Sequence, residues 1–194
     1  MRLSPRFLAA AMAVAPASVA AATADPPLAF VGVPLGTSEA AWRALKPPGP
    51  IPAHARRLCS DDPAGAAAGL KPDGPGAVVC GAVDDYGKIA VPVAFTWQGK
   101  YPLEQLRFVF VGGRLSEIRA QLPADAFDDV MARLDRVYGP ATHEVRDDLR
   151  TKIGRIPRVT ETWVRAAGRI DLVDPAVPGK LSLRITASKA ATPA

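Results

Sequence analysis

The sequence predicts an α+β fold, a two-layer sandwich in which short helices pack on one face of an antiparallel sheet. Three observations lead to this prediction. The stretch 125–138 carries apolar residues at helical spacing, period-2 segments lie before and after it, and short breaks containing Gly or Pro separate these segments. The expected order is strand, helix, a loop between two cysteines, three strands, helix and three strands.

The first 24 residues have the layout of a secretory signal peptide. Arg2 and Arg6 are the only charges before residue 25, and the apolar run 7–20 is too short to span a bilayer as a mature helix. Small residues follow, so we expect cleavage after Ala24, or two or four residues earlier. The mature protein is expected to be periplasmic or secreted. We expect no lipoprotein anchor, because no cysteine lies near the cut.

Removal of residues 1–24 leaves 170 of the 194 residues, which is enough for one ordinary domain. We expect a single α+β domain over residues 25–187, with two similar halves of about 28–122 and 123–187 as an alternative, and a disordered tail at 188–194. Loss of the two leader arginines lowers the formal net charge from +5 to +3. So mild a charge on an exported protein argues against nucleic acid as a partner.

The first predicted elements are a strand over 30–35 and a short helix over 38–46. Thr37 or Ser38 is expected to cap the start of this helix, and a Pro-Pro pair ends it. From there to residue 87 no sustained periodicity appears, except for one short strand at "AVVCGAV".

Cys59 and Cys80, the only cysteines in the chain, are expected to form a disulfide within this aperiodic segment. An oxidising compartment favours such a bond. A zinc site would need three or four ligands, and the chain adds only His54 and His143. No C-x-x-C redox motif is present. The enclosed loop is rich in Gly, Pro and Ala, so we expect it to have little secondary structure of its own.

The segment 88–98, "KIAVPVAFTWQ", alternates apolar and small or polar residues and is predicted to be a strand, with Pro92 at an edge or a bulge. The second predicted helix covers 125–138, with Asp125 as its cap and a Gly-Pro pair at its end. The stretches "TETWVRAAGRIDLVD" and "KLSLRITAS" predict the last three strands.

Residues 106–122, "LRFVFVGGRLSEIRAQL", are predicted to form a β-hairpin. A two-residue turn at Gly112 and Gly113 would set Phe108 opposite Glu117. A three-residue turn puts the apolar faces together, so this turn is expected. Three polar side chains of the second strand are then left for solvent or a partner. They are Glu117, Arg119 and Gln121.

Three stretches, "PLGTSEAAWRAL", "LRFVFVGGRLSEI" and "FDDVMARLDRVYGP", carry a resemblance to known families. Their order resembles small exported bacterial modules of the β-lactamase-inhibitor-protein type and the small lipoproteins of outer-membrane assembly. The resemblance covers residues 28–187 in layout only and implies short helices combined with a meander of strands. The assembly lipoproteins also carry a lipidated cysteine that this sequence lacks. The resemblance therefore implies no functional residue here.

No catalytic, cofactor-binding or metal site is predicted. No serine lies in G-x-S-x-G, His143 follows a helix end, and His54 lies in a proline-rich segment. If the cysteines are bonded, the pairs 61–62 and 84–85 could bring four aspartates together for a cation such as Ca²⁺. The D-x-D-x-D-G order is missing, so solvated loop acids are the preferred interpretation, and cation binding by Asp61, Asp62, Asp84 and Asp85 stays open.

A basic run falls within 13 residues of a segment expected to be a long loop after the second helix. Its members are Arg146, Arg150, Lys152, Arg155 and Arg158. One interpretation is a solvated loop with local ion pairs, and the other is a surface for an acidic partner or an anionic envelope component.

These observations predict an exported, non-enzymatic binding or envelope-maintenance module. We expect no cofactor, no membrane anchor and no nucleic-acid partner, and another envelope protein or an anionic envelope component is the expected partner. The alternative is a small periplasmic enzyme of the hydrolase type, whose site is dispersed along the sequence.

Overall fold

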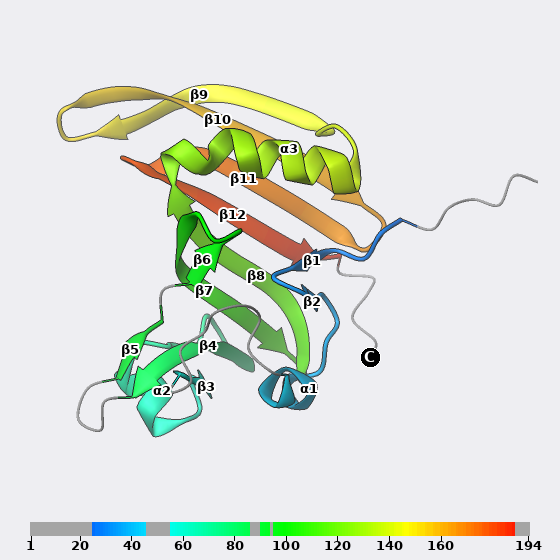
Figure 1. Cartoon of the computed structure of the whole chain (residues 1–194), viewed down its shortest axis with the longest axis vertical. Helices are drawn as coiled ribbons and strands as arrows, with labels where there is room; N and C mark the ends of the chain where they lie inside the picture. Colours follow the sequence, from blue (N-terminus) through cyan, green and yellow to red (C-terminus); the bar gives the residue numbers. More distant parts are fainter. Residues whose placement is uncertain (1–24, 46–54, 86–89, 94, 189–194) are drawn as a thin grey trace, which may run out of the picture.

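The computed structural model describes residues 25–45, 55–85, 90–93 and 95–188. The predicted signal peptide and residues 189–194 of the predicted tail lie outside the described residues. The described chain is a mixed α+β structure in which antiparallel sheet dominates (Figure 1). Within these ranges, no helix has the length and apolar character needed to cross a membrane.

Most strands belong to one antiparallel sheet with the order β3-β4-β7-β8-β12-β11-β10-β9. Short strands β5 and β6 pair with β4 and β7, and β1 and β2 form a separate ribbon. The strands are β1 (Ala29–Phe30), β2 (Val33–Pro34), β3 (Ala55–Cys59), β4 (Ala77–Asp85), β5 (Ala90–Pro92), β6 (Phe95–Trp97), β7 (Tyr101–Val111), β8 (Arg114–Pro123), β9 (His143–Thr151), β10 (Gly154–Arg165), β11 (Gly168–Val177) and β12 (Lys180–Ala187).

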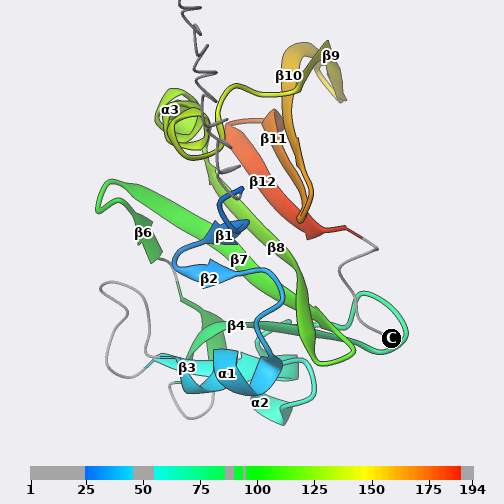
Figure 2. The same ribbon diagram turned by 90° about the vertical axis from the view of Figure 1, so that its right-hand side faces the viewer.

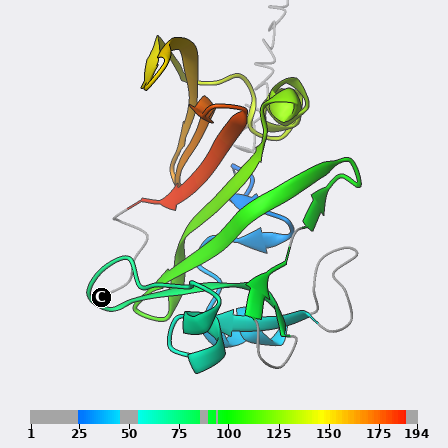
Figure 3. The same ribbon diagram turned by 90° about the vertical axis from the view of Figure 1, so that its left-hand side faces the viewer.

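The helices lie on both faces of the sheet. They are α1 (Glu39–Ala44), α2 (Pro63–Ala67) and α3 (Phe127–Tyr138), with a 3₁₀ turn, η1 (Ala124–Ala126), before α3. Figures 2 and 3 view α3 nearly end-on, beside β8 and β12. On the same face, Trp42 of α1 stacks on Phe108 with 5.3 Å between ring centroids. Helix α2 covers Val109, whose side chain points to the other face. The prediction that the helices share one face is therefore not confirmed.

One large cluster of buried side chains extends from Leu28 to Ile185 and reaches across the sheet from Cys59 in β3 to Trp163 in β10. Trp163 and Phe110 are among its largest fully buried members. The indole Nε1 of Trp163 donates to the carbonyl oxygen of Gly139 at 2.9 Å, so its polar atom is satisfied within the core. The choice between one domain and two similar halves stays a prediction.

Helices α1 and α3 form where the apolar spacing predicts them. The Ser38 Oγ accepts from the Ala41 N–H at 3.1 Å, which confirms the expected cap of α1. The expected cap of α3 by Asp125 is wrong, because Asp125 lies in the 3₁₀ turn and the residue at the cap position is Ala126, without a side-chain bond. Gly139, with φ 74°, ends α3 as expected.

The β7–β8 hairpin has a two-residue turn, so the predicted three-residue turn is wrong. Gly112 and Gly113 both have positive φ, 58° and 71°, as the preferred two-residue hairpin turns require. A bulge at Ser116 in β8 supplies the extra residue, and Phe108 therefore faces Ile118. The apolar faces meet as predicted. One extra residue in β8 shifts the strand register by one position, and one extra residue in the turn would have shifted it in the same way.

The expected disulfide is present between Cys59 and Cys80, which face each other across β3 and β4. The prediction that the enclosed segment has little secondary structure is wrong. The segment contains α2 and the paired ends of both strands, including the predicted strand at "AVVCGAV". Gly65 allows α2 to lie against β3, because a Cβ there would be 2.1 Å from the Cys59 carbonyl oxygen.

Two predicted strands are each divided in the structure. The predicted strand over 30–35 is the β1–β2 ribbon, folded at Val31 and Gly32. The predicted strand over 88–98 is β5 and β6, which pair with different neighbours, while residues 88, 89 and 94 lie outside the described residues. Pro92 lies in β5, whose partner in the described sheet is β4, in agreement with the expected edge position.

The segment after α3 was predicted to be a long loop, and this prediction is wrong. The segment is a β-hairpin formed by β9 and β10. Strand β10 pairs with β11 only from Val159 onward. Residues 147–158, here called the arm, therefore have only each other as ladder partners and project beyond the neighbouring strands (Figure 1). Both faces of the arm meet solvent, so its sequence has no apolar alternation to reveal the strands. An ion pair between Asp147 and Arg158 links the two strands instead.

Candidate functional site

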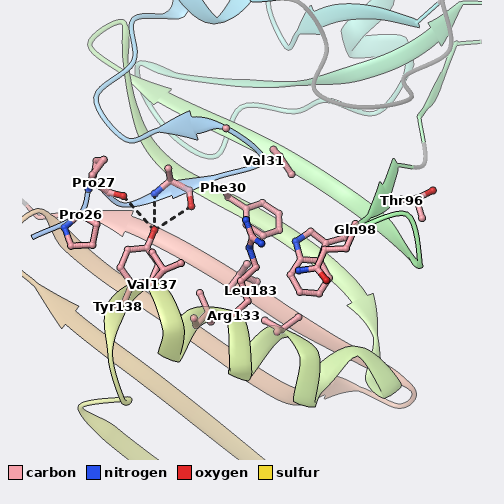
Figure 4. Close-up of a pocket in the computed structure, with 15 residues that line it drawn as sticks. Pro26, Pro27, Phe30, Val31, Thr96, Gln98, Arg133, Val137, Tyr138 and Leu183 are labelled. Atoms are coloured by element: carbon pink, nitrogen blue, oxygen red, sulfur yellow. Dashed lines mark hydrogen bonds between the residues drawn. The ribbon is translucent and has the colours of Figure 1, made fainter.

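An apolar groove lies between α3, the β1–β2 ribbon and the turn that joins β6 to β7 (Figure 4). Its volume of about 560 Å³ falls within the range of roughly 300–1,000 Å³ that is typical of small-molecule sites. The apolar side chains along it include Phe30, Val31, Trp97, Val130, Leu134 and Val137. The walls of the groove therefore come from three segments that are far apart in the sequence, and Leu183 of β12 also lines it.

Helical spacing explains the apolar wall that α3 contributes. Val130 and Leu134, one turn apart, are 2% and 7% exposed because they pack on the sheet. Val137 is 44% exposed, although it belongs to the same apolar stripe and lines the groove. The stripe of α3 is therefore wider than its contact with the sheet, and the remainder forms the wall of the groove.

Hydrogen bonds of Tyr138 hold the ribbon against the C-terminal end of α3. The hydroxyl accepts from the Ala29 N–H at 3.2 Å and lies 3.3 Å from the Pro27 carbonyl oxygen, to which it donates (Figure 4). A buried tyrosine hydroxyl needs polar partners, and here they are main-chain groups of Ala29 in the ribbon and of Pro27 just before it. One end of the groove is closed in this way.

Asp129 in the first turn of α3 holds the opposite end of the groove. Its Oδ2 accepts from the Tyr101 hydroxyl at 2.7 Å and from the Lys100 Nζ at 3.0 Å. Hydrogen bonds with Tyr101 and Asp129 raise the pKa of Lys100 to about 12. The hydrogen bonds from Tyr101 and Lys100 hold the pKa of Asp129 below its usual range. Between these two contacts, the groove separates α3 from the ribbon and from the β6–β7 turn.

Backbone strain is concentrated beside the groove. Among the described residues, three non-glycine residues have positive φ, and two of them, Val31 (46°) and Gln98 (54°), line the groove. For a β-branched residue such as Val31 this conformation is a genuine outlier. Strained residues of this kind cluster at functional sites, where the surrounding structure enforces them. The two turns therefore mark the groove as a candidate site.

Arg133 is the cationic side chain of the groove. It projects from α3 toward Phe30 and Gln98 (Figure 4) and is exposed. Among the described residues no side chain forms a hydrogen bond or ion pair with it. Arg136, also exposed on α3, does not line the groove. A guanidinium without a carboxylate partner, set on an apolar wall, has its donors available to an anionic ligand.

The structure brings the five predicted partner-binding cations together on the β9–β10 hairpin. They are Arg146, Arg150, Lys152, Arg155 and Arg158. Arg146 and Arg158 each bind a carboxylate of the same hairpin, and Arg155 lies 3.7 Å from another. Arg150 and Lys152 have no such partner in the described part of the chain. The predicted local ion pairs are therefore present for Arg146, Arg155 and Arg158, and binding of a partner by this segment stays a prediction.

The aspartate pairs considered for cation binding lie apart. Asp61 and Asp62 both bind Arg43, at 2.8 and 2.9 Å, and Glu39 binds the same guanidinium. Asp84 lies four residues beyond the disulfide along β4, at the other end of its pairing with β3. The hydrogen bond from the Cys59 N–H and the Arg43 charge offset burial and hold the pKa of Asp62 below its usual range. These carboxylates anchor α1 to the segment after β3.

Glu117, expected to face solvent or a partner, is 7% exposed. It lies on the face of the sheet opposite α3 and binds Arg119 and Arg184. Burial alone would raise the pKa of Glu117, but these two arginines hold it below its usual range. Asp73 also binds Arg119. The cluster ties β8 and β12 to the segment that follows α2.

No family model, curated protein or solved structure matches the chain. The resemblance in layout and the alternative of a hydrolase therefore stay predictions. His143 is exposed on β9, opposite Thr162, and His54 lies outside the described residues. Sequence reasoning missed the groove, because its walls come from separate segments. The available signals were the unusual turn "FVGV", with valine before glycine, and the width of the stripe on the second helix.

Proposed function

We propose that this protein is an exported binding module whose groove holds an anionic amphiphile, an apolar chain that ends in a carboxylate or phosphate. The observation that carries the proposal is Arg133, which lies without a described partner on the wall of the apolar groove. An apolar chain gains free energy by leaving water for such a groove. The guanidinium favours a planar or tetrahedral oxyanion through paired hydrogen bonds.

The hydrogen bonds at the two ends of α3 favour a groove that is already formed before a ligand binds. Tyr138 and Asp129 connect α3 to the two opposing walls, so little ordering is needed on binding. We also propose that the half of the sheet covered by α3 forms a two-layer arrangement of helix and sheet. In this arrangement α3 covers one face of the sheet and also forms one wall of the groove.

Export remains part of the proposal. The Cys59–Cys80 bond supports it, because disulfides persist in oxidising compartments. The test is the mass of the protein recovered from the periplasm of an expressing bacterium. We expect a chain that begins at Asp25 and gains two hydrogens on reduction. An intact Met1 would contradict export, and two freely alkylatable thiols would contradict the disulfide.

Three probes with the same dodecyl chain test the ligand class. Dodecanoate, dodecanol and dodecyltrimethylammonium share a twelve-carbon chain and carry an anionic, a neutral and a cationic head, and calorimetric titration at concentrations where each is monomeric compares them. We expect dodecanoate to bind about tenfold or more tightly than dodecanol, because a hydrogen bond to a charged group adds roughly 1.5–3 kcal/mol. The cationic probe should bind weakest. Equal binding of all three probes, or of none, would contradict the proposal.

Paired variants show where the probe binds. Arg133→Gln should weaken dodecanoate binding about tenfold, whereas Arg136→Gln, which removes the same charge outside the groove, should change it less than about twofold. Val137→Asp should also weaken binding, because it places a negative charge on the groove wall. Val177→Asp is its control, since Val177 is similarly exposed, at 46%, at the end of β11. Equal losses within either pair would contradict a site in the groove.

A further inference from the structure

The closed end of the arm, residues 149–156 and here called the arm tip, combines exposed apolar and cationic side chains. Ile153, in the turn between β9 and β10, is 97% exposed. Arg150, Lys152 and Arg155 lie beside it, and the arm tip contains no acidic residue. A large apolar side chain at the apex of a projection is costly in water unless something covers it.

Like charges face each other directly at the arm tip. Arg150 and Arg155 are register partners across β9 and β10. Such a pair destabilises a hairpin unless an anion lies between or above the two groups. The Asp148 carboxylate lies 3.7 Å from Arg155, and no carboxylate of the described residues forms an ion pair with Arg150. Binding of an anionic partner would therefore reduce the repulsion between Arg150 and Arg155 at the arm tip.

The arm tip is also positioned to reach a surface. Its ladder partners all lie within the arm, and it projects beyond the adjoining strands (Figure 1). The groove lies on the other side of α3, along the ribbon and the β6–β7 turn. A contact at the arm tip therefore leaves the groove open, and the inference below does not rest on the proposed ligand.

We propose that the arm tip docks on an anionic lipid bilayer. Ile153 enters the boundary between headgroups and acyl chains, while Arg150, Lys152 and Arg155 bind lipid phosphates. The apical isoleucine favours a bilayer over an extended acidic chain, because a bilayer offers an apolar layer directly beneath its phosphates and an extended acidic chain does not. The attraction falls as ionic strength rises, because the charges are exposed and screened.

Flotation with vesicles tests the proposal on the protein recovered from the periplasm. Binding to phosphatidylcholine vesicles should rise strongly when phosphatidylglycerol is included. The double variant Arg150→Ala/Lys152→Ala should weaken this binding about 30-fold, as expected for two basic residues near an anionic surface. Its control, Lys71→Ala/Arg136→Ala, removes the same charge from two exposed positions away from the arm and should change binding less than about twofold. Every variant is recovered in this form, because an apolar leader at residues 1–24 would bind vesicles by itself and mask the contribution of the arm tip.

Quenching by brominated acyl chains tests insertion itself. The native Trp42, Trp97 and Trp163 are 2%, 6% and 0% exposed, so bilayer contact should leave their fluorescence almost unchanged. Ile153→Trp should add emission that brominated anionic vesicles quench. Val111→Trp, 42% exposed beside the β7–β8 turn, provides a tryptophan that should not be quenched.

Four outcomes would overturn the proposal. They are equal loss of binding in the two double variants, equal binding to neutral and anionic vesicles, equal quenching of the two added tryptophans, and binding to soluble polyglutamate with none to vesicles. The last outcome would assign the cations to an acidic protein instead. Because the groove is tested with monomeric probes and variants of α3 and β11, failure of one proposal is distinguishable from failure of the other.

Discussion

Replacing Leu134 by alanine tests whether α3 packs on the sheet as described. The substitution removes three carbon groups from a side chain that is 7% exposed. At about 0.8 kcal/mol for each buried group, the lost transfer free energy is about 2–2.5 kcal/mol. Leu134 also borders the groove, so the space left behind opens into existing free volume. The added cavity cost should therefore be small, and we expect a total loss of about 2–3 kcal/mol, near the lower end for buried leucines.

The control for this prediction is the neighbouring residue on the helix. Arg133→Ala should change the free energy of unfolding by no more than about 0.5 kcal/mol, since Arg133 is exposed and has no partner among the described residues. Urea unfolding with the disulfide intact measures both variants. For a chain of this size the loss at Leu134 should lower the melting temperature by about 4–12 °C. Small and equal effects would refute the packing of α3 on the sheet.

Three further substitutions test other parts of the fold. Burial, and then the neighbouring Glu144 carboxylate, raises the pKa of Glu161. The stability linked to this group is thus fully present below its unfolded pKa and lost as pH rises through the folded pKa. Glu161→Gln should raise the free energy of unfolding by about 0.5–1 kcal/mol at pH 7 and leave it unchanged near pH 3, and an equal gain at both pH values would contradict this. Replacing Cys59 and Cys80 together by alanine should cost about 3 kcal/mol in urea unfolding, and a loss under about 1 kcal/mol would show that the bond restrains the unfolded chain little. Gly168→Ala should cost more than about 2 kcal/mol, because its Cβ would lie 2.0 Å from a carbonyl oxygen of β12, and an unchanged melting temperature would refute that packing.

Local patterns in the sequence predict the elements that bury one face. The stripe of α3, the disulfide and the pairing of Phe108 with Ile118 all follow from the positions of apolar residues and cysteines. The bulge at Ser116 does not follow from them. A three-residue turn and a two-residue turn with a bulge produce the same apolar pairing, so the sequence alone leaves both open.

The candidate groove depends on contacts between distant segments. Each wall has an ordinary local explanation: a helix with a wide apolar stripe, a short ribbon and a β-turn. Arg133 resembles Arg136, the other arginine of α3, in the sequence and differs from it only because the ribbon and the β6–β7 turn lie opposite Arg133. The periodicity of the sequence does not indicate that the ribbon and the β6–β7 turn lie opposite Arg133.

The sequence by itself determined the apolar stripe of α3, which cysteines are bonded and where the last three strands run, because each depends on local spacing or on a residue type with one available partner. Only the tertiary structure decided that the basic segment is a projecting hairpin and that α2 covers the opposite face. The arm has solvent on both faces, and its pairing depends on main-chain hydrogen bonds, which every residue type except proline can form. The groove likewise required the folded chain, because its volume is the space left between elements that each satisfy their own packing.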